Sequence, residues 1–374
     1  MKASYVFNFE DVMTDITSHF KKIDTNQYRT FGATPIIDQS AKDFCGYTDI
    51  EPEVDLVTPP YIVFGDHTRR FKFVDVDFVL GADGTKVLKA KVDADHKYLF
   101  HFLNSIKLEE AGYSRHYKYL KRTKLFVPPL AEQQRIAALL DTADRILKLR
   151  ESAIAKLDQL AQSVFVEIFG DPVKNTKNFP IENIGELPIH IADGNYSSKY
   201  PSASEFVDSG IPFIRANNLK NLTLVNDDVR YITERKHIEL AKGHLKFRDV
   251  VIVTRGEIGK VGLVPKEFDD ANMNAQLVLL RPNSSILLPE YLCHFFNNNY
   301  TKSYVKNFET GVALKQLPIG NLKKIKICIP PIALQNKFAN IVKKIESQIE
   351  FQNNQKFIIK SMLSSLQHQS FAVN

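Results

Sequence analysis

Two short stretches of this 374-residue chain contain residue types found in enzyme sites, but both lack the partners that catalysis requires. Thr58-Pro-Pro-Tyr61 is similar to the Pro-Pro-Tyr loop of enzymes that methylate amino groups, yet Thr58 stands where an acidic or amide side chain must hold the amine. Gly256-Glu-Ile-Gly-Lys-Val-Gly262 has neither the spacing of a dinucleotide fingerprint nor the residues of a P-loop. We interpret it as a turn between strands, with Arg255 and Lys260 facing outwards. The sequence therefore predicts no catalytic residue and no cofactor bound by this chain.

The histidines and cysteines form no metal-ligand pattern in the sequence. The ten histidines are scattered, and no two of them lie four residues apart beside a glutamate. Cys45, Cys293 and Cys328 are far apart and odd in number, which gives neither a disulfide framework nor a zinc spacing. We expect no metal site, and a reducing, cytoplasmic location.

The overall composition permits a nucleic-acid partner without requiring one. The chain has 49 Lys and Arg against 43 Asp and Glu, a formal charge of +6 and a pI of about 8.9. No apolar run approaches the length of a membrane span, and Glu10 and Asp11 follow too soon after the start for a signal peptide. We expect neither export nor membrane insertion. A chain of this length predicts two or more domains.

Side chains that could read DNA occur in both halves of the chain. Such reading needs Arg, Lys, Asn and Gln at base edges, and cations or small donors at phosphates. The candidates in the first half include a run in which basic and aromatic residues alternate: His67, Arg69, Arg70, Lys86, Ser114, Arg115, Tyr117 and Lys118. The candidates in the second half are Asn195, Tyr196, Lys199, Arg215, Asn217, Asn218, Lys220, Arg255, Lys260, Asn274, Gln276 and Lys315. Several lie in predicted turns beside strands, from which side chains can enter a groove.

An internal repeat shows that the two halves have the same order of parts. Leu125–Ala137, with its Pro-Pro pair, reappears as Ile327–Ala339, at an offset of 202 residues from Pro128 to Pro330. Upstream of each copy, Tyr98–Asn104 matches Tyr291–Asn297. Gly311–Lys315 precedes the second Pro-Pro pair as Ser114–Lys118 precedes the first.

Each Pro-Pro pair opens a long predicted helix, because proline is tolerated in a first turn but not in a helix interior. The segments Ala131–Phe169 and Ala333–Phe371 contain no Pro or Gly, and each would be about 58 Å long. Apolar residues with heptad spacing, here called the heptad seam, follow both segments. In the first they are Ile136, Leu140, Ala143, Leu147, Ile154, Leu157, Ala161, Val164 and Ile168, broken at Arg150. In the second they are Phe338, Val342, Ile345, Ile349, Ile359, Leu363 and Leu366, with Gln352 and Lys356 as polar interruptions.

The regions outside the helices have short β-type runs between Gly, Asn and Asp, such as 61–64, 71–74, 250–254 and 277–280. They predict two mixed α/β domains, over 1–128 and 171–329, with spacer helices over 129–170 and 330–374. Neither helix can bury its seam alone, so we expect the two to pair. Since the first helix ends where the second domain begins, the pairing must be antiparallel, in a pseudo-twofold, nearly circular layout. The fold class is α+β.

These residues resemble the specificity subunits of type I restriction–modification systems over essentially the whole chain. Pro128-Pro-Leu-Ala-Glu-Gln-Gln-Arg-Ile136 with Phe169-Gly-Asp-Pro172 is similar to that family's central helix, and Pro330–Gln335 to its second copy, although Leu334 and Asn336 depart from the pattern. Residues 64–69, 81–84, 210–217 and 254–259 are similar to recurrent target-recognition domains.

The resemblance implies two target-recognition domains, each reading half of a split double-stranded DNA site. It implies helices that dock two methyltransferase (modification) subunits, to which restriction and translocase subunits can add. S-adenosylmethionine, and ATP with Mg²⁺, would bind those partners and not this chain. Two alternatives stay open: a specificity module of another DNA modification or defence system, and a coiled-coil scaffold that binds only protein. The seam either only ties the domains together or, through flanking Leu139, Ile146 and Leu149, also offers a partner surface.

Overall fold

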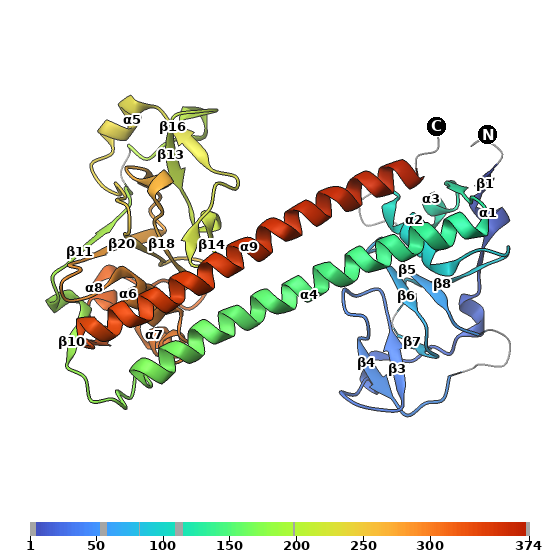
Figure 1. The fold of residues 1–374 in the computed structure, drawn as a ribbon, viewed down its shortest axis with the longest axis horizontal. Coiled ribbons are helices and arrows are strands. Elements are labelled where there is room, and N and C mark those ends of the chain that lie inside the picture. Colours follow the sequence, from blue (N-terminus) through green and yellow to red (C-terminus); the bar gives the residue numbers. More distant parts are fainter. Residues whose placement is uncertain (1–4, 53–57, 82, 109–114, 197–198, 372–374) are drawn as a thin grey trace. The chain divides into compact units, whose positions relative to one another are not determined.

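The computed structural model describes residues 5–52, 58–81, 83–108, 115–196 and 199–371. These residues form two units, each with its own internal contacts. Unit 1 combines Met1–Ser152 with Gln352–Asn374, and unit 2 is Ala153–Phe351. Each unit contains a mixed α/β domain and a stretch of each of two long helices, α4 and α9 (Figure 1). The α+β fold class is confirmed.

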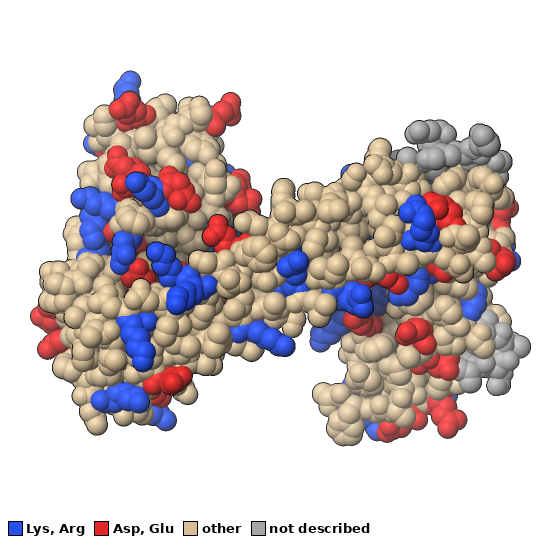
Figure 2. Space-filling view, in the orientation of Figure 1, with Lys and Arg blue, Asp and Glu red and all other residues tan. Residues whose placement is uncertain are grey.

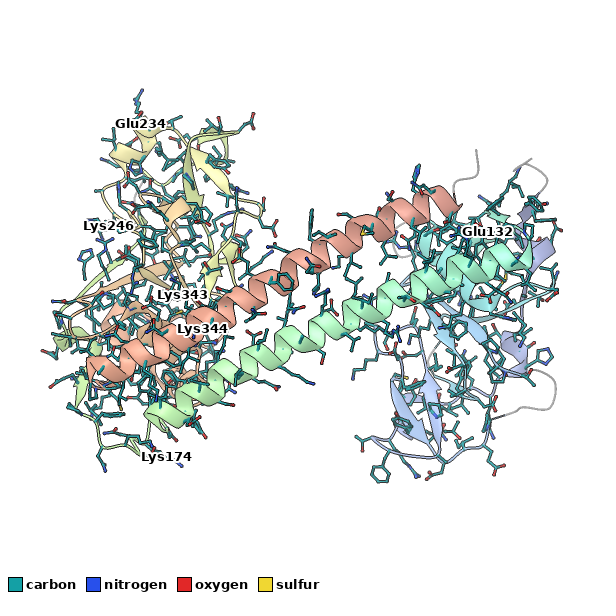
Figure 3. All side chains as sticks on the ribbon, viewed as in Figure 1. Glu132, Lys174, Glu234, Lys246, Lys343 and Lys344 are labelled. Atoms are coloured by element: carbon teal, nitrogen blue, oxygen red, sulfur yellow. The ribbon has the colours of Figure 1, made fainter. Side chains whose placement is uncertain are left out.

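Each of the two long helices begins one residue before its predicted proline-free segment, Ala131–Phe169 or Ala333–Phe371, and ends with it. Helix α4 spans Leu130–Phe169 and helix α9 spans Ile332–Phe371, 40 residues each. Both begin directly after a Pro-Pro pair, as expected from the missing proline N–H. Glu132 lies in the first turn of α4, where its charge favours the positive end of the helix dipole (Figure 3).

The helices run antiparallel within each unit. In unit 1, Ile136 and Leu140 from the start of α4 share a core with Phe371 from the end of α9. In unit 2, the ring of Phe165 near the end of α4 lies 5.4 Å from that of Phe338 near the start of α9. The predicted pairing direction is therefore confirmed in both units.

The polar breaks in the two seams meet one another in unit 1. The Arg150 Nη1 donates a hydrogen bond of 2.7 Å to the Gln352 side-chain oxygen, and Lys356 lies 3.0 Å from Glu151. These four residues, here called the polar layer, replace apolar contacts where the sequence departs from the heptad pattern. All the predicted seam positions are buried or half-buried.

The domain of unit 1 is built on a four-stranded sheet in the order β2-β8-β5-β6 and a three-stranded sheet in the order β4-β3-β7. Its strands are β1 Val6–Asn8, β2 Met13–Asp15, β3 Thr34–Ile37, β4 Gly46–Thr48, β5 Tyr61–Gly65, β6 Phe71–Val74, β7 Val79–Leu80, β8 Thr85–Ala90 and β9 Lys124–Phe126. Its short helices are α1 Phe9–Val12, α2 His96–Ser105 and α3 Tyr117–Leu120. Strand β5 is buried throughout because it lies between β8 and β6.

The domain of unit 2 has a six-stranded sheet, β11-β20-β17-β18-β15-β14, and a four-stranded sheet, β12-β16-β13-β19. Its strands are β10 Ile181–Asn183, β11 Ile189–Asp193, β12 Phe206–Val207, β13 Ile211–Ile214, β14 Leu219–Lys220, β15 Thr223–Leu224, β16 Arg230–Ile232, β17 Val250–Val253, β18 Val261–Leu263, β19 Asn272–Met273, β20 Leu277–Pro282 and β21 Lys326–Cys328. Its short helices are α5 Glu234–Glu239, α6 Pro289–Asn297, α7 Asn299–Val305 and α8 Ile319–Leu322. Single 3₁₀ turns lie at Thr17–His19 and Thr25–Gln27 in unit 1, and at Ile184–Glu186, Ala203–Glu205, Ala216–Asn218, Lys266–Phe268 and Lys306–Phe308 in unit 2.

The glycine-rich stretch at 256–262 connects two strands, as predicted. Strands β17 and β18 are antiparallel neighbours, and the Val253 N–H donates to the Lys260 carbonyl oxygen at 2.8 Å across the turn. Gly256 and Gly259 have φ of +87° and +83°, a left-handed conformation that side chains disfavour. The glycines therefore shape a tight hairpin.

Each domain joins its long helix through the same set of contacts, here called the junction. A two-stranded ribbon, β1-β9 in unit 1 and β10-β21 in unit 2, leads into each Pro-Pro pair. The Tyr98 hydroxyl donates to the Phe126 carbonyl oxygen at 2.7 Å, and the Tyr291 hydroxyl donates to that of Cys328 at 2.9 Å. The repeat in the sequence is thus a repeat in three dimensions.

Among the described residues, no helix combines the length and the hydropathy that crossing a membrane requires.

Candidate nucleic-acid interface

In unit 1, the turn between β5 and β6 lies against the segment that leads into α3. The Tyr117 N–H donates to the Asp66 carboxylate at 2.6 Å, and the His116 N–H donates to the Asp66 carbonyl oxygen at 2.9 Å. Two predicted groups, in 66–70 and in 115–118, are therefore brought together. Ser114, also predicted, lies outside the described residues.

Gln39 holds a third loop beside this turn. Its side-chain oxygen accepts from the His67 N–H at 3.2 Å, and its amide nitrogen donates to the Asp83 carbonyl oxygen at 3.1 Å. The Asp66 N–H also donates to the Gly84 carbonyl oxygen at 2.7 Å. Sequence reasoning missed Gln39 and Asp66. Both hydrogen-bond to loops that are far away in the sequence, and such contacts produce no recognisable local sequence pattern.

Lys86 and Tyr117 form part of the framework of this face. The Lys86 ammonium donates to Asp15 at 2.8 Å and lies 5.2 Å from the centre of the Tyr117 ring. Burial raises the pKa of the Asp15 carboxyl, but hydrogen bonds from Lys86 and Thr17 outweigh burial and leave that pKa lowered. Burial raises the pKa of the Tyr117 hydroxyl, whose ring packs edge-on against Phe9. Both side chains are committed to internal contacts.

Arg70, Arg115 and Lys118 are instead exposed, and Arg69 is half-buried with a left-handed φ of 58°. The Lys118 ammonium lies 4.9 Å from the centre of the Tyr119 ring. These cations, on two adjacent backbone segments, can contact phosphates or base edges from one face.

A groove of about 1170 Å³ lies between this domain and α4. Its basic lining residues are Arg69, Arg70, Lys72, Lys97, Arg145 and Lys148, and its carboxylates are Asp43, Asp75, Asp141 and Asp144. Arg145 and Lys148 are exposed on the helix, and sequence reasoning missed them because it considered α4 for helix pairing and protein partners but not for DNA. The excess of cations suits a polyanion.

In unit 2, five predicted residues gather around the start of the β17–β18 hairpin. The Arg255 guanidinium lies 4.7 Å from the centre of the Tyr196 ring, and the Tyr196 hydroxyl donates to the Ala275 carbonyl oxygen. Arg255 forms a β-bridge with Gln316, the neighbour of Lys315. Partial burial raises the pKa of the Tyr196 hydroxyl, although the Arg255 charge acts in the opposite direction.

The other members of this group come from the loop before β20. The Asn274 side-chain oxygen accepts from the Gln276 N–H at 3.1 Å, and the Thr254 N–H donates to the Gln276 carbonyl oxygen at 2.8 Å. Tyr196, Arg255, Asn274, Gln276 and Lys315 are here called the hairpin cluster. An aromatic ring, a guanidinium and an exposed amide in one place provide the groups that stack on and hydrogen-bond to bases.

Three predicted asparagines of unit 2 are buried and hold loops together. The Asn195 amide donates to the Lys242 carbonyl oxygen at 2.7 Å, and the Asn218 side-chain oxygen accepts from the Arg215 N–H at 2.9 Å. Asn274 is also buried. These residues shape the surface more than they offer groups to a ligand.

Four predicted cations of unit 2 lie close to carboxylates: Arg215, Lys220, Lys260 and Lys315. Arg215 lies 2.8 Å from Asp228, which also accepts from the Asn217 amide at 3.1 Å. The other ion pairs are Lys220 with Asp227, Lys260 with Glu257 at 2.7 Å and Lys315 with Glu309 at 3.6 Å. Lys199 is exposed. Exposed pairs of this kind contribute little stability and exchange partners readily.

A second groove, of about 610 Å³, lies between the unit 2 domain and α4. Lys220 and Lys260 line it together with Lys302 and Lys306, which sequence reasoning missed. Burial lowers the pKa of the Lys302 ammonium. On the face that Figure 2 shows, cations are interspersed with carboxylates on each unit.

The loop before Lys315 exposes two large apolar side chains. Val312 is 99% exposed and Leu314 is 88% exposed. Because they lie directly before Lys315 in the hairpin cluster, they extend its surface with groups able to contact thymine methyls or unstacked bases.

Comparison with known proteins identifies the family. The model of the type I restriction modification DNA specificity domain matches residues 17–159 and 175–360, one match for each half of the chain. The chain belongs to this family. As expected, it is a type I restriction–modification specificity subunit.

Individual relatives of this specificity subunit are distant. It is 23% identical over 299 residues to the type I restriction enzyme MjaVIII specificity subunit of Methanocaldococcus jannaschii, covering 74% of this chain and 70% of that one. It is 23% identical over 342 residues to the EcoR124I/EcoR124II specificity subunit of Escherichia coli, covering 87% and 82%. Matches to two other specificity subunits span 56% and 52% of those proteins. The crystal structure of a type I system S subunit from M. genitalium has the same fold, with a TM-score of 0.63, 15% identity and coverage of 99% and 96%.

Proposed function

We propose that this specificity subunit reads a bipartite DNA target, one half with each unit, and catalyses no reaction itself. The observation that carries the proposal is the repeated junction, which joins a domain with an exposed cation-bearing face to a long helix in each unit. Two faces that differ in sequence but attach in the same way suit two different half-sites.

Base reading is assigned to the exposed members of each face. In unit 1 these are Arg70, Arg115 and Lys118, and in unit 2 they are Arg255 and Gln276. Arginine and glutamine form two-point hydrogen bonds with guanine and adenine in the major groove. The two cations that α4 contributes to the groove, Arg145 and Lys148, are assigned to phosphates.

The flanks of the long helices are assigned to two methyltransferase subunits. Apolar side chains remain exposed on them in unit 1: Leu139, Leu149, Phe357, Ile358 and Met362. Ile146, predicted with Leu139 and Leu149, is half-buried. Large apolar groups on a helix flank are typical of a protein interface. S-adenosylmethionine, and ATP with Mg²⁺, belong to the methyltransferase and restriction or translocase partners in this proposal.

The test is a map of methylated sites in cells that express the complete complex with variants of this subunit. Arg255→Ala should weaken recognition of one half-site, and Arg115→Ala with Lys118→Ala should weaken only the other. Loss of one good base contact costs about 1–3 kcal/mol, or roughly 5- to 150-fold in occupancy. Lys174→Ala is the control, because Lys174 is exposed on unit 2 away from the hairpin cluster (Figure 3).

Equal loss at both half-sites would contradict independent reading by the two units. A purified chain that methylates DNA without a partner would contradict the non-catalytic assignment. DNA binding that is absent at low salt would favour the alternative of a protein-only scaffold.

A further inference from the structure

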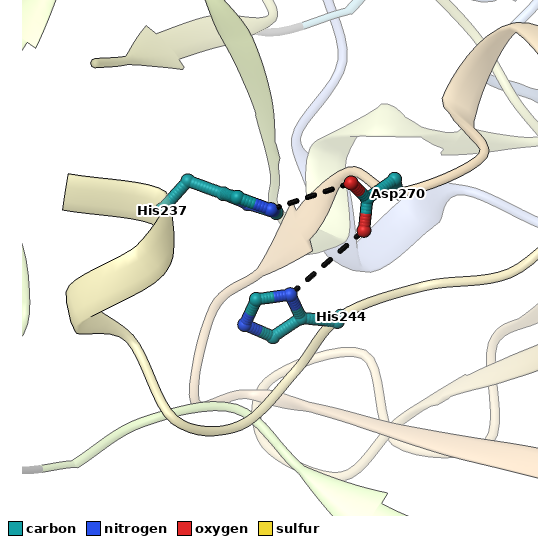
Figure 4. Close-up of side chains that lie close together, drawn as sticks. All are labelled: His237, His244 and Asp270. Atoms are coloured by element: carbon teal, nitrogen blue, oxygen red, sulfur yellow. Dashed lines mark ion pairs between the residues drawn. The ribbon is translucent and has the colours of Figure 1, made fainter. Parts of the chain in front are cut away.

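Two histidines and an aspartate that do not belong to the hairpin cluster converge in unit 2. The His237 Nε2 lies 3.4 Å from the Asp270 carboxylate and the His244 Nδ1 lies 3.9 Å from it (Figure 4). The two imidazole centres are 4.5 Å apart. One ligand atom from each residue lies within 4.8 Å of the other two. We call these residues the His-His-Asp cluster.

The far nitrogen of each imidazole is engaged by a carbonyl-type oxygen. The His237 Nδ1 lies 2.5 Å from the side-chain oxygen of Asn272, and the His244 Nε2 lies 2.5 Å from the Leu240 carbonyl oxygen. Because these oxygens only accept hydrogen bonds, the proton of each neutral imidazole is on the far nitrogen. A hydrogen bond of this kind orients the histidines that bind metals in proteins.

The near nitrogens therefore present lone pairs to the Asp270 carboxylate. Three electron-rich groups that face one point repel one another unless a positive charge lies between them. A single dication satisfies all three groups.

We propose that the His-His-Asp cluster binds one Zn²⁺ ion, with a fourth position open to water. Two imidazole nitrogens and one carboxylate oxygen are a zinc donor set, whereas Ca²⁺ and Mg²⁺ prefer all-oxygen sites. Tetrahedral bonds of about 2.0–2.1 Å place ligand atoms about 3.4 Å apart, so the cluster, whose ligand atoms lie within 4.8 Å of one another, closes by up to about 1.4 Å on binding. The Asp270 side chain is 72% exposed and can make that movement, while His237 is 8% exposed and fixed.

The ion would join two segments that the sequence separates. His237 lies in α5 and His244 in the loop after it, while Asp270 lies in the turn before β19. The Asp270 N–H already donates to the Leu245 carbonyl oxygen at 2.9 Å, and His244 forms a β-bridge with Asn272. Zinc therefore stabilises the edge of the four-stranded sheet. This site could not be predicted from the sequence, because the spacing from His237 to Asp270 matches no ligand motif.

The test uses the full chain, stripped of metal with a chelator and then titrated with ZnCl₂. We expect one zinc per chain after dialysis, by elemental analysis, and a Tm raised by about 5 °C at hundredfold excess over Kd. Co²⁺ should give the visible absorption of a tetrahedral site. Asp270→Asn should weaken zinc binding roughly 100-fold. Its backbone should be undisturbed, because φ at this position is 66° and asparagine tolerates that conformation.

His190→Gln is the matched control, since His190 is exposed on β11 outside the cluster. It should bind zinc as the unmodified chain does. A second variant, His244→Gln, removes a half-buried ligand and should also abolish the Co²⁺ spectrum. Absence of retained zinc from the unmodified chain would overturn the proposal, as would equal affinity of Asp270→Asn and His190→Gln.

Discussion

At the scale of single residues, one glutamine in each half links a domain to its long helix. The Gln335 side-chain oxygen accepts from the Leu288 N–H at 2.8 Å, and its amide donates to the carbonyl oxygens of Pro330 and Ile286 at 2.8 and 2.9 Å. Gln133 makes the matching bonds in unit 1, to the Asp95 N–H and the Pro128 carbonyl oxygen. Gln133 and Gln335 occupy the same position of the sequence repeat, 202 residues apart, and these shared contacts explain why both copies have glutamine there.

Gln335→Leu should destabilise unit 2 strongly. The change leaves a buried N–H and two carbonyl oxygens without their partner, at about 1–3 kcal/mol for each fully desolvated group. We expect a loss of about 3 kcal/mol in the free energy of unfolding of unit 2, measured by urea denaturation with a probe in that unit.

Gln348→Leu, an exposed change on the same helix, should shift that free energy by less than about 0.5 kcal/mol. Equal effects of the two variants would show that the glutamine bonds contribute nothing specific to the junction.

Some functional residues could be predicted from the sequence, and others could not. Sequence reasoning found the exposed cations and the repeated Gln133 and Gln335, because residue type and repetition are visible in one dimension. It could not find Asp66 or Gln39, whose function is to hold loops from distant parts of the chain, nor separate buried Asn218 from exposed Gln276. Which predicted side chains contact DNA stays a prediction.

At the scale of elements, the long helices were predictable because proline placement and heptad spacing act locally. The strands at 61–64, 71–74, 250–254 and 277–280 were also confirmed, from their β-branched and aromatic content. The pattern did not single out Phe165 and Phe169, which lie one position beyond seam residues and pack into the unit 2 core. A heptad pattern identifies the residues through which one helix packs against another. The rings of Phe165 and Phe169 also pack against Tyr291 of the domain, a contact that the heptad pattern does not predict.

The exposed flank of α9 makes a prediction about assembly. Phe357 and Met362 are 73% and 67% exposed, while Lys343 and Lys344 mark the polar flank of the same helix in unit 2 (Figure 3). Phe357→Ser with Met362→Ser should weaken binding of the methyltransferase subunit roughly tenfold or more, because each buried aromatic or methionine contributes about 1–2 kcal/mol at an interface. Affinity is measured by titration with the purified methyltransferase subunit.

Phe247→Ser is the control for loss of an exposed aromatic side chain outside α9. Phe247 is half exposed on the unit 2 domain. This variant should leave methyltransferase affinity unchanged. Unaltered affinity of the Phe357 and Met362 variant would assign docking to another surface.

At the scale of the whole molecule, α4 and α9 each contribute residues to both units without a break. If the helices set the spacing of the half-sites, four residues inserted after Leu147 and four near Ile349 should keep the pair in register. Four residues turn a helix by about 400° and lengthen it by about 6 Å, nearly two base pairs. The variant should recognise the same half-sites with a spacer longer by one or two base pairs.

Genome-wide mapping of methylated sites, for the parent and the doubly inserted subunit in complex with the methyltransferase, measures that spacer. A variant inserted in α4 alone is the control, and it should lose activity because the seams no longer match. An unchanged spacer in the double variant would refute the role of the helices as a ruler.

The polar layer also has an evolutionary consequence. Arg150 can donate to Gln352, and Glu151 can meet Lys356, in only one alignment of the helices. A slip by one heptad would leave the guanidinium against apolar side chains, which costs several kcal/mol. If each unit reads its own half-site, we expect recombination that joins half of this gene to half of a related one to yield a working hybrid only when both parents carry matching polar residues at this level. The donors compatible with such an exchange would then be restricted to relatives that share this pairing.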